Sequence, residues 1–263
     1  MQTEKIIHHI VNWLTDYLEN SHQKGFILGI SGGIDSAVVS TLCAQTGFPV
    51  LCLELPIHQE TKQVDRAKNH IRWLKESFLK VHDQTVDLTS VYDQFVEVAE
   101  KHGNDDVYQL SLANTRARLR MTTLYYYAAL NGYIVAGTGN KIEDFGIGFF
   151  TKYGDGGVDI SPIGDLMKSE VYAIAKHLNI LPEIQNAVPT DGLFGDNRSD
   201  EDQIGATYDE LEWAMKLKEK GHNLNEFSGR EREVFEIYEK RHRANLHKIH
   251  PIPICEIPKD WKN

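Results

Sequence analysis

One stretch, from Phe26 to Val39, constrains the fold of this chain more than any other. It opens with Phe26 to Ile30, an apolar run that is too short for a helix and typical of a buried parallel strand. The small residues Ser31, Gly32 and Gly33 follow, and a backbone with such side chains can turn sharply and approach a ligand closely. The sequence therefore predicts a buried strand that ends in a tight turn.

A helix is predicted directly after this turn. Asp35 and Ser36 stand where it would start, and residues Ser36 to Thr46 read as the helix itself. The free N–H groups and the positive dipole end of a helix start would meet the turn at one point. This is an anion site, most simply for phosphate or pyrophosphate. An ordinary strand-to-helix turn is the competing interpretation, and the stretch lacks the spacing of a Walker loop or a G-x-G-x-x-G motif.

Strands alternate with helices through the first half of the chain. The pattern predicts an amphipathic helix over 3–20, buried strands at 49–56, 80–86 and 133–136, and helices at 60–75, 88–102 and 107–130. The expected fold is α/β: a doubly wound, mostly parallel sheet with helices on both faces. Further helices are predicted over 165–178, 204–220 and 228–246. Ligands of such sheets bind beyond the carboxyl ends of the strands.

Three polar segments are candidates for the binding site. Residues 137–143 follow a strand at the predicted ligand edge, and the glycine-rich loop 148–162 carries Lys152, Asp155 and Asp159. The acidic segment 189–202 is expected to be a mobile lid. Arginines 116, 118 and 120 fall together on one predicted helix, where they are either a solvated face or phosphate contacts.

Composition excludes several classes of protein. The formal charge of −10 argues against a broad nucleic-acid-binding surface, which requires many basic residues. No apolar run is long enough to cross a bilayer, and the N-terminus shows no signal peptide. The three cysteines are scattered and form no metal pair, as expected in a reducing cytoplasm. We therefore expect a cytoplasmic protein that binds neither nucleic acid nor membranes.

Several motifs in order resemble NAD synthetase, a member of the ATP pyrophosphatase superfamily. These are Ser31-Gly-Gly-Ile-Asp-Ser36, Asn114-x-x-Ala-Arg-x-Arg120, Gly137-Thr-Gly-Asn-Lys-x-Glu143 and Phe149-Phe-Thr-Lys-Tyr-Gly-Asp-Gly-Gly157. The resemblance continues through Lys168 and residues 189–190 and 202–210 to His247-Lys248. It implies a single synthetase domain over 1–263 that lacks a glutamine amidase domain.

The resemblance also implies an activity, which is ATP-dependent amidation of deamido-NAD (nicotinic acid adenine dinucleotide) to NAD. Attack of the carboxylate on the ATP α-phosphate would give an acyl adenylate and pyrophosphate, and ammonia would then displace AMP. Such a reaction needs no protein nucleophile, so catalysis would rest on positioning and on neutralising phosphate charge. ATP is then a co-substrate, Mg²⁺ the cofactor, ammonia the nitrogen source and a homodimer the expected assembly.

Individual roles follow from the same resemblance, with Asp35, Asp155 and Lys168 as catalytic residues. The implied ATP contacts are Gly29, Ser31, Gly32, Gly33, Asp35, Ser36, Arg120, Thr138, Lys168 and Thr190. The implied deamido-NAD contacts are Arg118, Lys152, Asp155, Asp159, His247 and Lys248. The implied Mg²⁺ ligands are Asp35, Glu143 and Thr190, and Asp155 would help to accept a proton from ammonium.

The sequence departs from the family pattern in two places. The segment from Glu143 to Gly148 is one residue longer than usual, which leaves Asp144 as an alternative metal ligand. Ile249 follows Lys248 where many members carry a basic residue, which weakens phosphate contacts there. Two other functions compete with this one. A tRNA-modifying adenylating enzyme would need a basic surface and reactive cysteines, and a nucleotide-binding regulator would not need the 148–162 loop.

Overall fold

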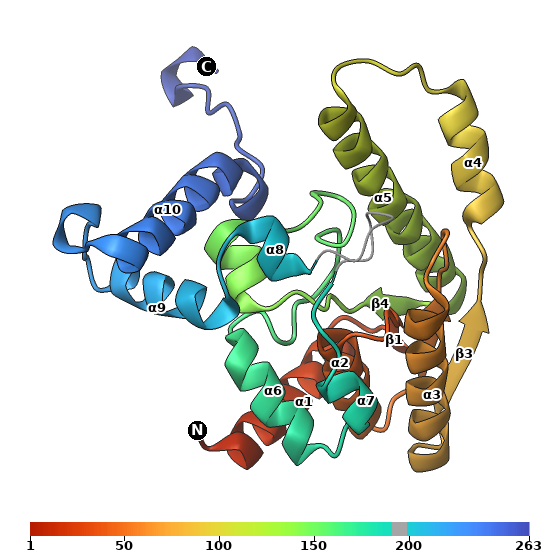
Figure 1. The fold of residues 1–263 in the computed structure, drawn as a ribbon. Coiled ribbons are helices and arrows are strands. Elements are labelled where there is room, and N and C mark those ends of the chain that lie inside the picture. The colour runs from red at the N-terminus through yellow and green to blue at the C-terminus, as the bar shows by residue number, and fades with distance from the viewer. Residues whose placement is uncertain (191–198, 263) are drawn as a thin grey trace.

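A four-stranded parallel sheet forms the centre of the molecule (Figure 1). The computed structural model describes residues 1–190 and 199–262. Its strands, in the order β3-β2-β1-β4, are β1 (Gly25–Gly29), β2 (Val50–Glu54), β3 (Val81–Thr85) and β4 (Tyr133–Val135). The chain winds outward from β1 to β2 and β3, then returns to add β4 on the other side of β1. This reversal next to β1 is the position where such sheets bind ligands.

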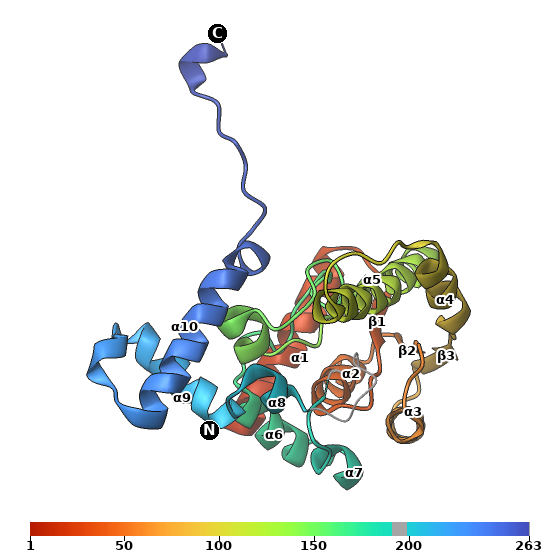
Figure 2. The same ribbon diagram turned by 45° about the horizontal axis from the view of Figure 1, so that its top comes forward.

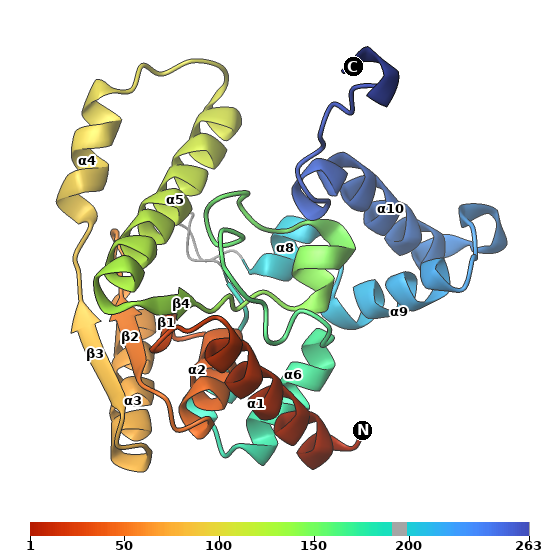
Figure 3. The ribbon, with the colours of Figure 1, turned by 180° about the vertical axis from the view of Figure 1, so that it is seen from behind.

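Helices cover both faces of the sheet, as the sequence predicts (Figure 3). The side chains of β1 alternate, with Phe26 and Leu28 packing on one face and Ile27 on the other. The first face is covered by α1 (Thr3–Asn20), α2 (Ile34–Gln45), α3 (Thr61–Ser77), α6 (Lys168–His177) and α7 (Pro182–Gln185). The second is covered by α4 (Thr89–Val98) and α5 (Asp105–Asn131).

The C-terminal helices form a third cluster beyond the carboxyl edge of the sheet (Figures 1 and 2). Its core is Phe235, Leu211, Ile142 and Ile147, all fully buried. The elements are η1 (Ile142–Ile147), α8 (Asp200–Ile204), α9 (Tyr208–Glu219), η2 (Leu224–Glu226) and α10 (Gly229–Ile249). The short helix η3 (Lys259–Trp261) lies beyond α10 in the C-terminal tail (Figure 2), and its residues are exposed. No described helix is both long enough and apolar enough to cross a membrane.

The helix predicted over 204–220 is α9, which begins at Tyr208, and a separate short helix, α8, precedes it. Gly205 ends α8 with φ of 88°, a left-handed conformation that favours glycine. Thr207 then begins α9 with a capping box, because its hydroxyl accepts from the Glu210 N–H while the Glu210 carboxylate accepts from the Thr207 N–H. The turn at Gly205 lies between Asp200 in α8 and Tyr208 in α9 and brings their side chains together. Both side chains belong to the site described below.

Two further helix starts differ from the prediction. Helix α2 begins at Ile34 with Gly33 as its N-cap, so Asp35 and Ser36 lie inside the first turn and do not cap it. Helix α6 begins at Lys168, three residues after the predicted Asp165. The Glu170 carboxylate accepts from the backbone N–H of Met167 at 2.8 Å, which fixes that start.

Candidate active site

A cavity of about 310 Å³ opens at the carboxyl ends of β1, β2 and β4. Its walls come from the turn after β1, the end of β2, the middle of α5, the loop after β4 and the start of α6. Most of the predicted site residues line it: Gly29, Ser31, Gly33, Asp35, Ser36, Arg120, Thr138, Glu143, Asp155, Lys168 and Thr190. The alternative metal ligand Asp144 lines it as well.

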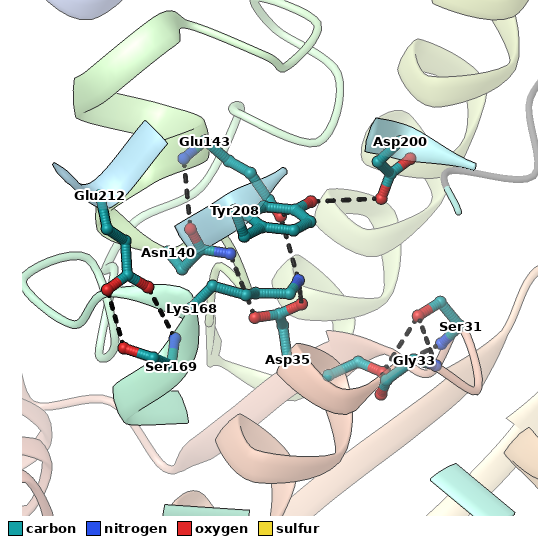
Figure 4. Close-up of polar contacts among 11 residues, drawn as sticks. Ser31, Gly33, Asp35, Asn140, Glu143, Lys168, Ser169, Asp200, Tyr208 and Glu212 are labelled. Carbon is teal, nitrogen blue, oxygen red and sulfur yellow. Dashed lines mark hydrogen bonds and ion pairs between the residues drawn. The ribbon is translucent and has the colours of Figure 1, made fainter. Parts of the chain in front are cut away.

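The turn after β1 is held in one shape by its own hydroxyl groups. Ser31 Oγ accepts from the Gly33 N–H at 3.2 Å and lies 3.1 Å from Ser36 Oγ (Figure 4). Gly32 has φ of 79°, and a Cβ there would lie 2.5 Å from the Gln63 carbonyl oxygen. Arg66 Nε donates to the Gly32 carbonyl at 3.2 Å. The turn therefore presents the start of α2 to the cavity as a preformed anion site.

An ion-pair network lies at the floor of the cavity (Figure 4). The buried ammonium of Lys168, from the start of α6, lies 2.6 Å from Asp35 Oδ2 and 3.1 Å from Glu143 Oε1. Asp35 comes from the first turn of α2, and Glu143 comes from η1. The amide of Asn140 donates to Asp35 Oδ1 at 3.2 Å, and its Oδ1 accepts from the Glu143 N–H at 3.2 Å. Three separate elements thus place one cation between two carboxylates.

Burial and charge act against each other on these three groups. Burial raises the pKa of Asp35 above its usual value, although the ammonium of Lys168 opposes it. For Glu143, burial also opposes ionisation, but Lys168, Tyr208 and Asn140 together hold its pKa below its usual value. Burial disfavours the charged form of Lys168, but both carboxylates outweigh it and raise the pKa of that ammonium. Lys168 is therefore a permanent positive charge in the cavity wall.

Tyr208 and Asp200 complete the network from the C-terminal helices. The hydroxyl of Tyr208 donates to Glu143 Oε1 at 2.7 Å and lies 3.3 Å from Asp200 Oδ2. Its ring lies beneath the ammonium of Lys168, whose nitrogen is 4.8 Å from the ring centroid. This arrangement adds a cation–π contact to the two ion pairs.

Element η1 is a single turn of π-helix, and it covers most of the segment that is expected to be one residue longer than the family pattern. The wide turn directs both Glu143 and Asp144 toward the cavity. A Cβ at Gly139 would lie 2.0 Å from Asp144 Oδ2, so only glycine leaves room for this carboxyl group. Burial, followed by the charges of Glu143, Asp155 and Asp35, raises the pKa of Asp144 well above its usual value.

The donors around Lys168 suit a Mg²⁺ ion bound together with nucleotide. No group of three or more His, Cys, Asp or Glu side chains in the described part of the chain is arranged to hold a metal. Mg²⁺ commonly binds through one or two carboxylates and the phosphates of a substrate, and Asp35 and Glu143 supply two hard oxygen donors beside one cation. Thr190 lines the same cavity. The carboxylate of Glu143, which shares the Lys168 ammonium with Asp35, is better placed for this than that of Asp144.

The residues predicted to bind deamido-NAD divide into three places. Asp155 lines the cavity, where its Oδ1 accepts from the Thr151 N–H at 2.9 Å. Outside the cavity, Arg118 Nε donates to the Lys152 carbonyl at 3.3 Å and Lys152 Nζ donates to the His247 carbonyl. Lys248 joins this group by donating to the Phe150 carbonyl at 2.6 Å. We call Arg118, Lys152, His247 and Lys248 the basic rim.

Asp159 lies apart from the other predicted substrate contacts. Its carboxylate accepts from the Tyr125 hydroxyl and from the Val135 N–H, both at 2.9 Å, at the end of β4. The predicted lid falls largely on residues 191–198, which are outside the described residues. Tyr208, Asp200, Asn140 and Glu212 are polar neighbours of the network that the sequence reasoning did not assign. The capping box of Thr207 and Glu210 marks the start of α9 but gives no sign of the partner of Tyr208.

Comparison with known proteins finds relatives that span most of this chain. The family model described as NAD synthase matches residues 6–252. An NH3-dependent NAD(+) synthetase of Finegoldia magna is 38% identical over 213 residues, which is 81% of this chain and 84% of the relative.

Two solved structures resemble the whole fold. An NMN synthetase from Francisella tularensis is 31% identical with a TM-score of 0.83, covering 98% of this chain and 99% of its own. An NH3-dependent NAD synthetase from Campylobacter jejuni is 28% identical with a TM-score of 0.78, covering 97% and 100%. Since a family model and a relative above 30% identity both span most of it, the chain belongs to the NAD synthase family, among the NH3-dependent NAD synthetases, and is an ATP-using ligase.

Proposed function

We propose that this enzyme amidates the nicotinate carboxyl group of deamido-NAD with free ammonia, producing NAD, AMP and pyrophosphate. The observation that carries this proposal is the placement of Lys168 between Asp35 and Glu143, beside the anion site at the start of α2. A reaction that moves negative phosphate groups needs a fixed cation and hard oxygen donors at that point.

The reaction divides into two displacements. A carboxylate oxygen of the substrate attacks the α-phosphorus of ATP, and the bond to the bridging oxygen breaks to release pyrophosphate. Ammonia then attacks the carbonyl carbon of the acyl adenylate, and the C–O bond to AMP breaks as the amide forms. One proton must leave the nitrogen in this second displacement, while the AMP phosphate departs as an anion.

The residues supply charge and position for these displacements. The turn of Ser31 to Ser36 holds the departing pyrophosphate, and Lys168 neutralises phosphate charge that develops on it. Asp155 accepts the proton from the nitrogen. Desolvation by the surrounding protein raises the pKa of Asp155, and the residue is nevertheless accessible from the cavity that it lines, and both properties suit a general base.

We also propose that Mg²⁺ binds with ATP through Asp35, Glu143 and Thr190. When bound, the ion supplies Lewis-acid polarisation of the phosphate oxygens. Asp35 and Glu143 would hold the ion, and the ammonium of Lys168 beside them supplies a positive charge for the phosphates.

The main alternative within this function is a smaller acid substrate, a mononucleotide in place of the dinucleotide. The similarity to an NMN synthetase favours nicotinate mononucleotide as a second candidate, with nicotinamide mononucleotide as its product. The basic rim favours the dinucleotide, because Lys152 and Lys248 lie outside the cavity where a second phosphate and nucleoside would extend.

We propose that the chain acts as a homodimer through the outer face of α4 and α5. This surface exposes several large apolar side chains among polar ones, and such side chains are commonly buried in isologous interfaces. Its exposed side chains are Val91, Phe95, Val98, Val107, Leu110, Tyr126 and Leu130. Light scattering of the wild type and a Phe95→Glu, Leu110→Glu variant tests it, with a monomeric wild type as the contrary result.

We also propose that residues 1–263 form a single domain. One cooperative unfolding transition would support this proposal.

The decisive experiment supplies ATP, Mg²⁺ and ammonium with either deamido-NAD or nicotinate mononucleotide, and measures the amide product and AMP. We expect AMP equal to product, with a larger kcat/KM for deamido-NAD. A parallel reaction with glutamine in place of ammonium should give no product. A larger kcat/KM for the mononucleotide would replace the substrate in this proposal, and no amide from either acid would overturn it.

A further inference from the structure

Helix α9 contacts the start of α6 at two points, Lys168 and Ser169. Tyr208 and Glu212 are one helical turn apart and therefore share a face of α9. The ring of Tyr208 lies 4.8 Å from Lys168 Nζ, at the ammonium end of the side chain. Glu212 lies at the opposite end, where it contacts the backbone of the residue that follows Lys168 (Figure 4).

The contacts of Glu212 fix the first turn of α6. One carboxylate oxygen accepts from the Ser169 N–H at 2.8 Å, and the other accepts from the Ser169 hydroxyl at 2.8 Å. Glu212 is buried, with only 4% of its surface exposed, and its remaining contact is Lys216 at 3.4 Å. The first N–H groups of a helix have no partner within the helix, so a carboxylate from elsewhere both satisfies one and favours the positive dipole end.

We propose that Glu212 is a positioning residue, which sets the direction of the Lys168 ammonium by locking the start of α6. Lys168 is the first residue of α6, so the backbone of that turn determines where its side chain begins. The carboxylate thereby connects the packing of the C-terminal helices to the phosphate end of the cavity. A charge buried at this depth is expensive to retain for packing alone, because an apolar side chain of similar volume would fill the space.

This inference rests on the proposed contact between Lys168 and ATP phosphates, and its test separates the two. The measured quantity is the Kd for α,β-methylene-ATP with Mg²⁺, which requires no turnover. Four proteins form the cycle: wild type, Glu212→Met, Lys168→Met and the double variant. We expect Glu212→Met to weaken binding about tenfold when Lys168 is present, as loss of outer-shell partners commonly does. In the Lys168→Met background it should change the Kd little.

Conservative and control variants make the result specific. Glu212→Gln keeps one acceptor for the Ser169 N–H and should bind nearly as well as wild type. Ser169→Ala removes a single hydrogen bond and should weaken binding about threefold, which keeps the test available if Glu212→Met does not fold. Lys216→Met removes the surface neighbour of Glu212 but leaves its bonds to Ser169, so its Kd should match wild type.

Each contrary outcome has a different meaning. Equal weakening by Glu212→Met with and without Lys168 would show a general structural role and overturn this inference alone. No weakening by Lys168→Met would instead remove the proposed phosphate contact, and with it the basis for the inference. Circular dichroism melting of every variant, run beside the binding titrations, excludes partial unfolding as the source of a changed Kd.

Discussion

Lys168 Nζ lies 2.6 Å from Asp35 Oδ2, although 133 residues separate the two along the chain. Each residue sits in the first turn of a helix, and both helices pack on the same face of the sheet. Helix α2 starts directly after β1 at the carboxyl edge of the sheet, and the segment between η1 and α6 returns the chain to the same edge. The Lys168–Asp35 ion pair therefore depends on the sheet topology. The ion pair in turn keeps a positive ammonium group in the cavity.

Replacing this lysine tests its role directly. Lys168→Met keeps the aliphatic length but removes the cation, so kcat/KM for ATP should fall by a factor of about 10²–10³. The product assay described above measures it. Lys176→Met, at the exposed far end of the same helix, serves as the control and should keep wild-type activity. A loss in the control as large as in the test variant would argue against a specific role.

Substitutions of Glu143 and Asp144, the two neighbouring carboxylates of η1, are expected to change the Mg²⁺ requirement differently. Glu143 shares the Lys168 ammonium with Asp35, whereas Asp144 lies against Gly139. Glu143→Gln should therefore raise the Mg²⁺ concentration that gives half-maximal activity by about tenfold. Asp144→Asn should leave that concentration close to its wild-type value. If Asp144→Asn produces the larger shift, Asp144 rather than Glu143 is the metal ligand.

Much of this fold was predictable from local pattern. The apolar run before Ser31, the glycine turn and the alternation of strands with helices gave the parallel sheet and its ligand edge, because burial on both faces leaves a clear signature. The motif resemblance added residues that the fold brings into one cavity, including Asp35, Glu143 and Lys168.

The missed features depend on contacts between distant segments. Nothing local in the sequence shows that Tyr208 hydrogen-bonds to Glu143, 65 residues earlier, or that Glu212 binds the start of α6. The start of α9 was readable, since a glycine followed by a Thr-x-x-Glu capping box marks a new helix, but the predicted helix starts at residue 204, four residues before the observed one. The π-helical turn η1 was not predicted as such. The sequence showed only a longer segment between Glu143 and Gly148.

The break before α9 predicts a stability effect. Thr207→Ala removes the side-chain acceptor for the Glu210 N–H and should lower the free energy of unfolding by about 1 kcal/mol. Ser228 occupies the corresponding N-cap position of α10 but makes no capping hydrogen bond, so Ser228→Ala is the matched control. Urea titration of both variants measures the difference. Equal destabilisation by the two substitutions would contradict the assigned cap.

His70 should make the folded protein sensitive to acid. It is fully buried between α3 and α2, where its Nε2 lies 2.9 Å from Ser40 Oγ and its ring stacks on Trp73. Its Nδ1 is buried without a hydrogen-bond partner among the described residues. Burial lowers the pKa of His70 from 6.5 to about 4, so the folded state resists a proton that the unfolded state accepts.

The sign of the effect follows from proton binding. Between about pH 4 and pH 6.5 the unfolded chain binds more protons at this position, so stability falls as the pH is lowered through that range. The expected loss from this one group approaches about 3 kcal/mol at the acid end, since each pKa unit is worth about 1.4 kcal/mol. Well above pH 6.5 the imidazole is neutral in both states and contributes no slope.

Replacing the imidazole should remove this part of the acid response. His70→Gln is expected to be less stable than wild type at pH 7, because the packing against Trp73 is reduced, yet its free energy of unfolding should change less between pH 7 and pH 4.5. His177→Gln, an exposed histidine at the end of α6, should keep the wild-type slope. Urea unfolding at several pH values gives all three slopes. A His70→Gln protein with an unaltered acid slope would show that other groups, rather than this buried ring, set the acid sensitivity.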